Sequence, residues 1–203
     1  MKTFIALLIA CCVLSCKDTT GAKNDHKTTE IGQNDSKTEI AYNQLIVPAS
    51  RLGSIKLLEE SKAVYDSLGT ADAGDAAMQK AVSTWYFDNP KAILTLFTAI
   101  HDQNSMQHKI YLIRSTSPGF KTENGFGVNS SLDEVKSHFS IEKQGTFTEN
   151  GQEYTLYETQ EGIGFEFDKN QKCSGVIVHE SDAKANQTYL PIYSDFHFTE
   201  NGQ

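Results

Sequence analysis

The sequence predicts an α+β fold of two helix-plus-antiparallel-meander repeats, in which the helices pack on one face of the sheets. An internal repeat, two helix patterns and a series of strand-like runs favour this class. The repeat becomes visible when Ile55 is set against Phe126. The same offset pairs Leu57 with Val128, Val64 with Val135, and Leu68 with Phe139. Apolar residues in register over such a distance indicate that one structural unit occurs twice.

Each copy is predicted to begin with a short helix. In the second copy, Ser131 and Glu134 have the spacing of a capping box, and Leu132, Val135 and Phe139 follow at three- and four-residue steps. In the first copy the helix runs from about Glu60 to Leu68, and Gly69 stands where a helix C-terminal cap is expected. Both copies are therefore predicted to contain a short helix that ends in a turn.

Strand-like runs follow each helix, and they are rich in β-branched and aromatic residues. They cover residues 83–88, 91–100 and 109–116 in the first copy and 153–159, 163–168 and 174–180 in the second. Short turns between consecutive strands imply antiparallel meanders, with a helix on the apolar face of each. The predicted repeats occupy residues 44–120 and 121–203, and whether residues 189–198 add an edge strand stays open.

The amino terminus is predicted to be a signal peptide covering residues 1–15. Thr3 to Leu14 are uncharged, and this run is shorter than the roughly 20 residues that a membrane-spanning helix needs. It ends in Val13-Leu14-Ser15-Cys16, which resembles the bacterial lipobox. The resemblance implies cleavage before Cys16, acyl chains such as palmitate on Cys16, and, with Lys17 next, sorting to the outer membrane. An ordinary secretory signal is the alternative.

Residues 16–43 are predicted to form a flexible tether, because they are too polar to compensate for the entropy lost on ordering. The whole chain has a formal net charge of -8 and no basic cluster, which argues against nucleic-acid binding. Beyond the tether, Cys173 is the remaining cysteine. A disulfide framework and a cysteine-rich metal site are therefore not expected.

The paired helix-then-meander pattern, with Val64 to Gly69 as a Val-x-x-x-Leu-Gly helix end, resembles tandem SmpA/OmlA-type lipoprotein domains. The fold of β-lactamase inhibitor protein is similar. The resemblance covers residues 55–180 and implies a non-enzymatic protein that binds other proteins, often through an exposed sheet face. The sequence departs from it at Phe139-Ser140, where the second helix ends without a glycine, and in the long segment from Thr70 to Val82.

The sequence contains no recognisable catalytic motif, so we predict no enzyme activity, no cofactor and no metal centre. His101 and His108 flank one predicted turn and are more readily explained as solvated residues than as metal ligands. Cys173 is better explained as a small, buried apolar residue than as a nucleophile. His179 and Glu180 are adjacent on a strand, so their side chains point to opposite faces and cannot act together on one substrate.

Aromatic residues are the predicted binding residues. Trp85, Tyr86, Tyr111 and Tyr157 lie on strand-like runs, and consecutive rings on a strand place at least one away from the core. The predicted function is therefore an envelope lipoprotein that binds another envelope protein through exposed sheet faces. Binding of a small ligand or ion, or an unrecognised hydrolase, are the alternatives.

Overall fold

The computed structural model describes residues 41–88, 91–102, 104–181, 183, 185, 192–193 and 195–199. Residues 38–203 form one compact unit. The predicted signal peptide, the lipidation site Cys16 and the predicted tether up to residue 40 lie outside the described residues. Among the helices that are described, none is long and apolar enough to cross a membrane.

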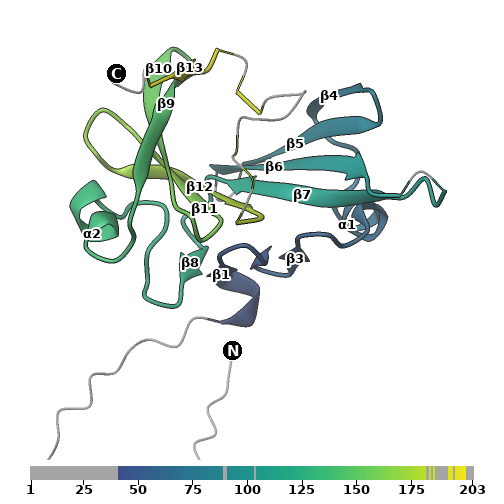
Figure 1. Cartoon of the computed structure of the whole chain (residues 1–203), viewed down its shortest axis with the longest axis horizontal. Helices are drawn as coiled ribbons and strands as arrows, with labels where there is room; N and C mark the ends of the chain where they lie inside the picture. The colour runs from purple at the N-terminus through teal and green to yellow at the C-terminus, as the bar shows by residue number, and fades with distance from the viewer. Residues whose placement is uncertain are drawn as a thin grey trace, which may run out of the picture. The chain divides into compact units, whose positions relative to one another are not determined.

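A large antiparallel sheet dominates this unit (Figure 1). Its strand order in the described residues is β13-β9-β10-β11-β12-β7-β6-β5-β4. The strands are β4 (Ala73–Ala77), β5 (Lys80–Asp88), β6 (Lys91–Ile100), β7 (His108–Ser115), β9 (Glu142–Glu149), β10 (Gln152–Glu158), β11 (Ile163–Phe167), β12 (Cys173–His179) and β13 (His197–Phe198). β4 to β7 form one meander and β9 to β12 another, and β7 pairs with β12, so the two meanders share one sheet.

A smaller sheet has the strand order β3-β2-β1-β8. It consists of β1 (Leu45–Val47), β2 (Arg51–Leu52), β3 (Ile55–Lys56) and β8 (Lys121–Thr122). β1 follows a short 3-10 helix, η1 (Tyr42–Gln44), and pairs in parallel with β8. The Arg51 guanidinium lies 3.8 Å from the centre of the Tyr42 ring and donates a hydrogen bond to the Gly53 carbonyl at 2.7 Å. These contacts tie η1 to the small sheet.

Two short α-helices lie on the same side of the large sheet as the small sheet, because all three contribute to one core cluster. α1 (Ser61–Leu68) ends at Gly69, which has a positive φ of 78°. α2 (Leu132–Lys136) begins with the predicted capping box, in which the Ser131 hydroxyl accepts from the Glu134 amide and the Glu134 carboxylate accepts from the Ser131 amide. The C-terminal end of α1 and the N-terminal start of α2 thus form as their local sequence predicts.

The predicted fold class, an α+β fold of two helix-plus-meander repeats, is wrong. Of the described residues, 50% lie in strands and 11% in helices, and the strands form two sheets. The two helices have eight and five residues and are too short to cover the sheet. The meanders also do not form separate units, because backbone hydrogen bonds between β7 and β12 make them one sheet. Strands β1 to β4, β8 and β9 were not predicted, and β13 is an edge strand in the segment 189–198 where the sequence left one open.

The large sheet is buried on both faces. Val176 and Val178 of β12 belong to the first core cluster, and Ile177 between them belongs to the second. Because side chains alternate along a strand, the two clusters lie on opposite faces. The first cluster packs against α1, α2 and the small sheet, and the second packs against residues near the C-terminus: Ala185, Ile192, Tyr193 and Phe196. The chain therefore supplies its own cover for both faces.

A buried ion pair crosses the second face. The Arg114 guanidinium of β7 donates to the two Glu166 carboxylate oxygens of β11 at 2.5 and 2.8 Å, and both side chains are buried. Nη1 and Nη2 of Arg114 also donate to the Glu149 carboxylate of β9, at 3.1 and 3.0 Å. Burial alone would lower the pKa of Arg114, but the charge and hydrogen bonds of Glu166 outweigh it and raise that pKa well above its ordinary range.

Gly175 makes this contact possible, since β12 lies between β7 and β11. A Cβ atom on Gly175 would stand 2.3 Å from a Glu166 carboxylate oxygen, closer than any stable contact. Glycine therefore leaves the space through which Glu166 reaches Arg114. Tyr193 completes the cluster by donating its hydroxyl to Glu166, and its ring stacks on Phe147 with centroids 4.0 Å apart. The C-terminal segment is thus fixed to the sheet through the ion pair.

We predict that Arg114→Leu and Glu166→Leu each lower the free energy of unfolding by about 3–5 kcal/mol, because each leaves a buried charge without its main partner. The double variant Arg114→Leu/Glu166→Leu should lose less than the sum of the two. Urea unfolding of the full chain, followed by the fluorescence of Trp85, measures this, because Trp85 is the one tryptophan in the sequence.

Asp66→Ala is the control for this cycle. Asp66 pairs with Lys62 at 2.7 Å, but both side chains are exposed, so its loss should change stability by no more than about 0.5 kcal/mol. Single substitutions at Arg114 and Glu166 that cost as little as Asp66→Ala would contradict a structural role for the buried pair.

Candidate functional site

Two consecutive residues at the end of β5 have exposed aromatic side chains. Tyr86 is 57% exposed and Phe87 is 40% exposed. They point to opposite faces of the strand. The Tyr86 amide donates to the Asp72 carboxylate at 2.8 Å, which fixes the strand there although β4 pairs with β5 only as far as Thr84. We call Tyr86 and Phe87 the aromatic edge.

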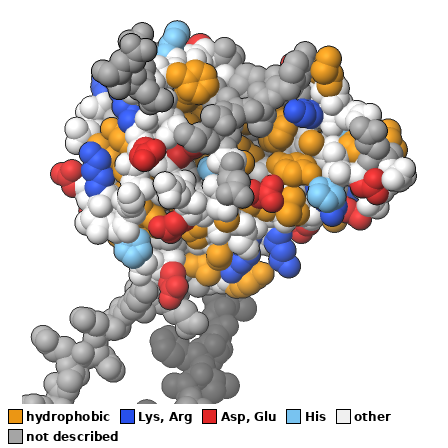
Figure 2. Space-filling model, in the orientation of Figure 1, with side chains coloured by type: hydrophobic (Ala, Val, Ile, Leu, Met, Phe, Trp, Pro, Cys, Tyr) orange, Lys and Arg blue, Asp and Glu red, His pale blue; other side chains and the backbone are white. Residues whose placement is uncertain are grey.

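An apolar cavity of about 280 Å³ lies beside Phe87. Its apolar lining comes from β3, α1, β5, β6 and the segment before β8: Ile55, Leu68, Phe87, Ala92, Ile93, Leu94 and Phe120. Figure 2 shows hydrophobic side chains gathered over the half of the molecule that contains β4 to β7. α1 is too short to cover this part of the sheet, so the cavity opens beside it.

The other three predicted binding residues lie elsewhere. Trp85 is 3% exposed, and its indole nitrogen donates to the Gly69 carbonyl at 3.1 Å, so its ring belongs to the core and not to the surface. Tyr111 is half-buried and its hydroxyl lies 2.7 Å from Nδ1 of His101; burial and the charge of Glu180 raise the pKa of Tyr111. Tyr157 packs edge-on against Phe167 at a centroid distance of 5.6 Å. Tyr86 is thus the exposed member of the predicted set.

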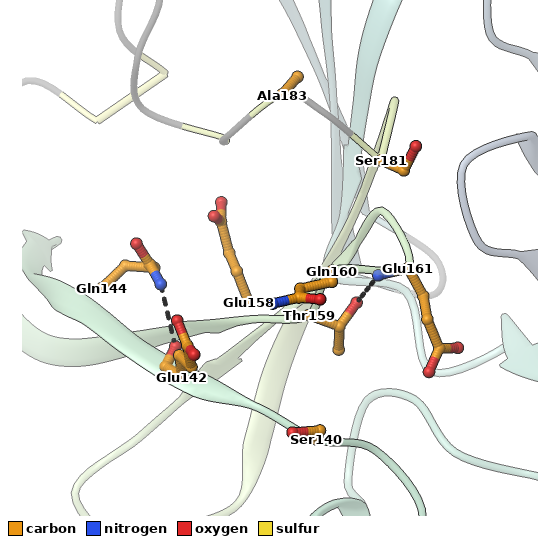
Figure 3. Close-up of a pocket in the computed structure, with 9 residues that line it drawn as sticks. All are labelled: Ser140, Glu142, Gln144, Glu158, Thr159, Gln160, Glu161, Ser181 and Ala183. Carbon is orange, nitrogen blue, oxygen red and sulfur yellow. Dashed lines mark hydrogen bonds between the residues drawn. The ribbon is translucent and has the colours of Figure 1, made fainter.

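A polar cavity of about 390 Å³ lies in the other half of the sheet (Figure 3). Its charged lining residues are Glu142 of β9, Glu158 of β10 and Glu161 of the β10–β11 turn. Hydroxyl and amide side chains make up most of the rest: Ser140, Gln144, Thr159, Gln160 and Ser181. These lining residues belong to the described part of the chain and include no lysine or arginine.

Thr159 shapes the turn beneath this cavity. Its hydroxyl donates to the Ile163 carbonyl at 3.0 Å and accepts from the Glu161 amide at 3.1 Å. Gly162 then takes a positive φ of 81°, and a Cβ atom there would lie 2.4 Å from the His179 carbonyl oxygen. The sequence Thr-Gln-Glu-Gly thus forms a tight turn, and the Thr159 hydroxyl, engaged in that turn, is a poor nucleophile for a hydrolase.

Glu158 connects the polar cavity to a histidine inside the fold. Glu158 is 4% exposed and extends from β10 toward Ala183, and its Oε1 accepts from the Ala185 amide at 2.6 Å. His179 of β12 is 1% exposed, and its Nε2 lies 3.7 Å from the same oxygen. Nδ1 of His179 lies 2.8 Å from the Glu180 carbonyl oxygen, which can only accept, so Nδ1 carries a proton. Nε2 has no hydrogen-bond partner.

Sequence reasoning found neither this pair nor the polar cavity. It gave His179 no partner, and it placed His179 and Glu180 on opposite faces of a strand, whereas β12 ends at His179 and both residues line one apolar cavity. His101 and His108, the alternative metal ligands, do not form a site: no group of three His, Cys, Asp or Glu side chains in the described residues is arranged to hold a metal ion. The lipidation site Cys16 lies outside the described residues.

Comparison with protein-family models, with curated proteins and with solved structures finds no match for this chain. The resemblance to SmpA/OmlA-type lipoproteins therefore stays a prediction from sequence.

Cys173 is predicted to be chemically inert in the folded chain. It is buried, its thiol donates to the Gly175 carbonyl at 3.3 Å, and burial is the main cause that raises its pKa to about 12. Because the folded pKa lies above the ordinary value of 9.0, Cys173 contributes stability below pH 9 that is lost as pH rises toward 12. Between pH 9 and 12, the free energy of unfolding should therefore fall less steeply with pH in Cys173→Ala than in the native chain, by about 1.4 kcal/mol per pH unit.

Urea unfolding of both chains at several pH values above 9 measures this difference in slope. In parallel, a thiol reagent should label Cys173 only when the chain unfolds. Rapid labelling of Cys173 in the folded full chain, or equal alkaline slopes for both chains, would show that the thiol is accessible or ionised in the native state.

Proposed function

We propose that this chain is an envelope lipoprotein, anchored in the outer membrane through lipid on Cys16, that acts as a protein-binding module. The signal-like segment and the lipobox-like Val13-Leu14-Ser15-Cys16 support the anchor. The polar stretch that follows supports a module that can reach away from the membrane surface. Two or more acyl chains on one cysteine are enough for stable anchoring, whereas one chain binds only marginally.

The aromatic edge beside the apolar cavity is the observation that carries the protein-binding proposal. Tyrosine and phenylalanine offer a large contact area with few rotatable bonds, so little entropy is lost when a partner covers them. The cavity of about 280 Å³ has room for an apolar side chain of a partner. Burying such a side chain contributes about 1.5–3 kcal/mol, which is the size of effect found at the central residues of interfaces.

The charges near the aromatic edge constrain the partner further. The Asp72 carboxylate accepts from the Tyr86 amide, and Asp88 follows Phe87 on β5. Lys91 of β6 lies opposite Asp88. A partner segment that presents an apolar side chain next to a basic residue fits this arrangement. Charge complementarity of this kind favours encounter and orientation more than final affinity.

Cys16→Ser tests the anchor. The variant should no longer incorporate radiolabelled palmitate and should move from the membrane fraction to the soluble fraction, because the acylation needs a thiol. Fractionation of cells that produce the full chain measures both. A Cys16→Ser chain that stays in the membrane fraction would contradict lipid anchoring at this residue.

A photo-crosslinking residue at position 86 tests the protein contact. In intact envelopes it should capture a discrete partner, and Phe87→Ser in the same chain should reduce that capture roughly tenfold, because an interface loses about 1–2 kcal/mol when a central aromatic is removed. Mass spectrometry of the adduct identifies the partner, and the yield of the adduct measures the effect.

Two controls are built into the fold. Phe198→Ser makes the same chemical change at an exposed aromatic residue of β13, in the other half of the sheet, and should leave the capture unchanged. A crosslinker at the exposed position 153 should not give the same adduct. Equal loss with Phe198→Ser, or identical adducts from positions 86 and 153, would overturn the assignment of the contact to the aromatic edge.

A further inference from the structure

The end of β5 has a neighbouring strand on one side only. β4 pairs with β5 from Lys80 to Thr84, whereas β5 continues to Asp88. β6 accompanies β5 over its whole length, and β4 is the last strand of the large sheet on the other side. Residues 86–88 therefore lie at an edge where no described strand covers their backbone. Unpaired backbone groups at a sheet edge are a template for a further strand.

The backbone groups of Tyr86 point to this open side. Tyr86 lies opposite Ile93 of β6, and the Ile93 amide and carbonyl both bond to Thr116, on the β7 side. Because pairs alternate along an antiparallel ladder, Tyr86 faces away from β6, and so does Asp88 two residues on. The bond from the Tyr86 amide to the Asp72 carboxylate agrees with this direction. The Tyr86 carbonyl and the Asp88 amide are thus directed outward, without a strand partner in the described residues.

The neighbouring edge strand is protected in a way that the end of β5 is not. The Ala76 amide of β4 bonds to the adjacent Asp75 carboxylate at 2.7 Å, so a side chain of the chain itself occupies that position. Such local caps and charges are a common protection of sheet edges. At the end of β5, Asp72 caps the Tyr86 amide alone. One acceptor and one donor therefore stay available, and both lie at the aromatic edge.

The alternation of side chains along β5 sets the chemistry of a strand added there. Phe87 shares the face of Trp85, which belongs to the core cluster under α1, and the apolar cavity lies beside Phe87. Tyr86 and Asp88 share the other face, and Lys91 occupies the β6 side of Asp88. Residues opposite each other on neighbouring strands interact through their side chains. An apolar residue opposite Phe87 and basic residues beside the Tyr86 ring and the Asp88 carboxylate complement this edge.

We propose that the partner contact at the aromatic edge is made by an extended segment that adds to β5 as a further strand. This inference rests on the proposed protein-binding function and names the kind of partner. The segment donates a backbone hydrogen bond to the Tyr86 carbonyl and accepts one from the Asp88 amide. Its apolar side chain lies beside Phe87, between two basic side chains on the opposite face. In strand addition, backbone bonds supply affinity and alternate side chains supply specificity.

A blocked peptide with this pattern, acetyl-Lys-Leu-Lys-Leu-Lys-amide, is the probe. The same peptide with every backbone nitrogen methylated keeps the side chains but cannot donate. A third peptide with glutamate in place of lysine keeps the backbone and reverses the charge. Calorimetric titration into the full chain in neutral detergent micelles, with empty micelles as the blank, compares the three.

The lysine peptide should bind, and the methylated peptide should bind roughly tenfold more weakly, because backbone bonds are lost without replacement. The glutamate peptide should also bind several-fold more weakly, since like charges meet. No binding of the lysine peptide, or equal binding of the methylated peptide, would overturn strand addition. Equal binding of the glutamate peptide would overturn the basic flanks of the segment.

Two substitutions at one position separate the backbone contact from the charge. Asp88→Pro removes the outward amide, and proline is tolerated at a sheet edge because that amide has no ladder partner there. Asp88→Ala removes the same carboxylate and keeps the amide. Asp88→Pro should weaken binding of the lysine peptide roughly tenfold and Asp88→Ala no more than about threefold. Equal effects of the two would show that the backbone of Asp88 takes no part.

Hydrogen exchange in the native chain measures the same contact without a substitution. With the lysine peptide bound, the Asp88 amide should exchange roughly tenfold more slowly, because a bonded amide must open before it exchanges. The amides of β13, at the opposite edge of the sheet, should exchange as before. An unchanged rate at Asp88 would overturn strand addition. If position 86 then still captures a partner in a manner that needs Phe87, the protein-binding function stands and the contact is made by side chains alone.

Discussion

The contact on which the rest of the structure depends is the buried pair of Arg114 and Glu166. Two charges taken out of water are unfavourable unless each finds its partner in good geometry, and here both Glu166 oxygens meet the guanidinium. The pair joins β7 to β11 across β12, so it fixes the place at which the two meanders meet. It also binds Tyr193, which brings the C-terminal segment over the second face of the sheet. One ion pair thus links the two meanders to each other and to the segment that covers them.

Glycine at one strand position makes the buried Arg114–Glu166 pair possible. Gly175 leaves the space in which Glu166 reaches Arg114. A side chain at this position would occupy the face that Glu166 crosses. Nε, Nη1 and Nη2 of Arg114 each donate to a carboxylate, whereas Nε2 of the buried His179 has no hydrogen-bond partner among the described residues. The Arg114–Glu166 pair therefore stabilises the fold.

Local sequence predicted the strands with strong patterns, the C-terminal end of α1 and the N-terminal start of α2, but not the architecture. β6, β7, β11 and β12 carry continuous or alternating apolar residues and lie where they were expected. β4 was missed because Ala-Gly-Asp-Ala-Ala has no β-branched residue, and the polar sequence of β9 shows no alternation. Trp85 and Tyr86 must point to opposite faces, yet only the position of α1 and Tyr65 decides which ring is buried. The contact between Glu158 and His179 needs the strand order, which no local pattern contains.

The two candidate sites lie in the two halves of the large sheet, which are covered to different degrees. α1 leaves the β4–β7 half with exposed aromatic residues and an apolar cavity, so this half suits contact with a protein surface. In the other half, β11 and β12 are almost completely buried, and the cavity beside β9 and β10 is polar and acidic. Inside these two buried strands, an unsatisfied nitrogen such as Nε2 of His179 costs about 1–3 kcal/mol. The tight packing of β11 and β12 offsets this cost, whereas the β4–β7 half leaves its apolar side chains partly uncovered.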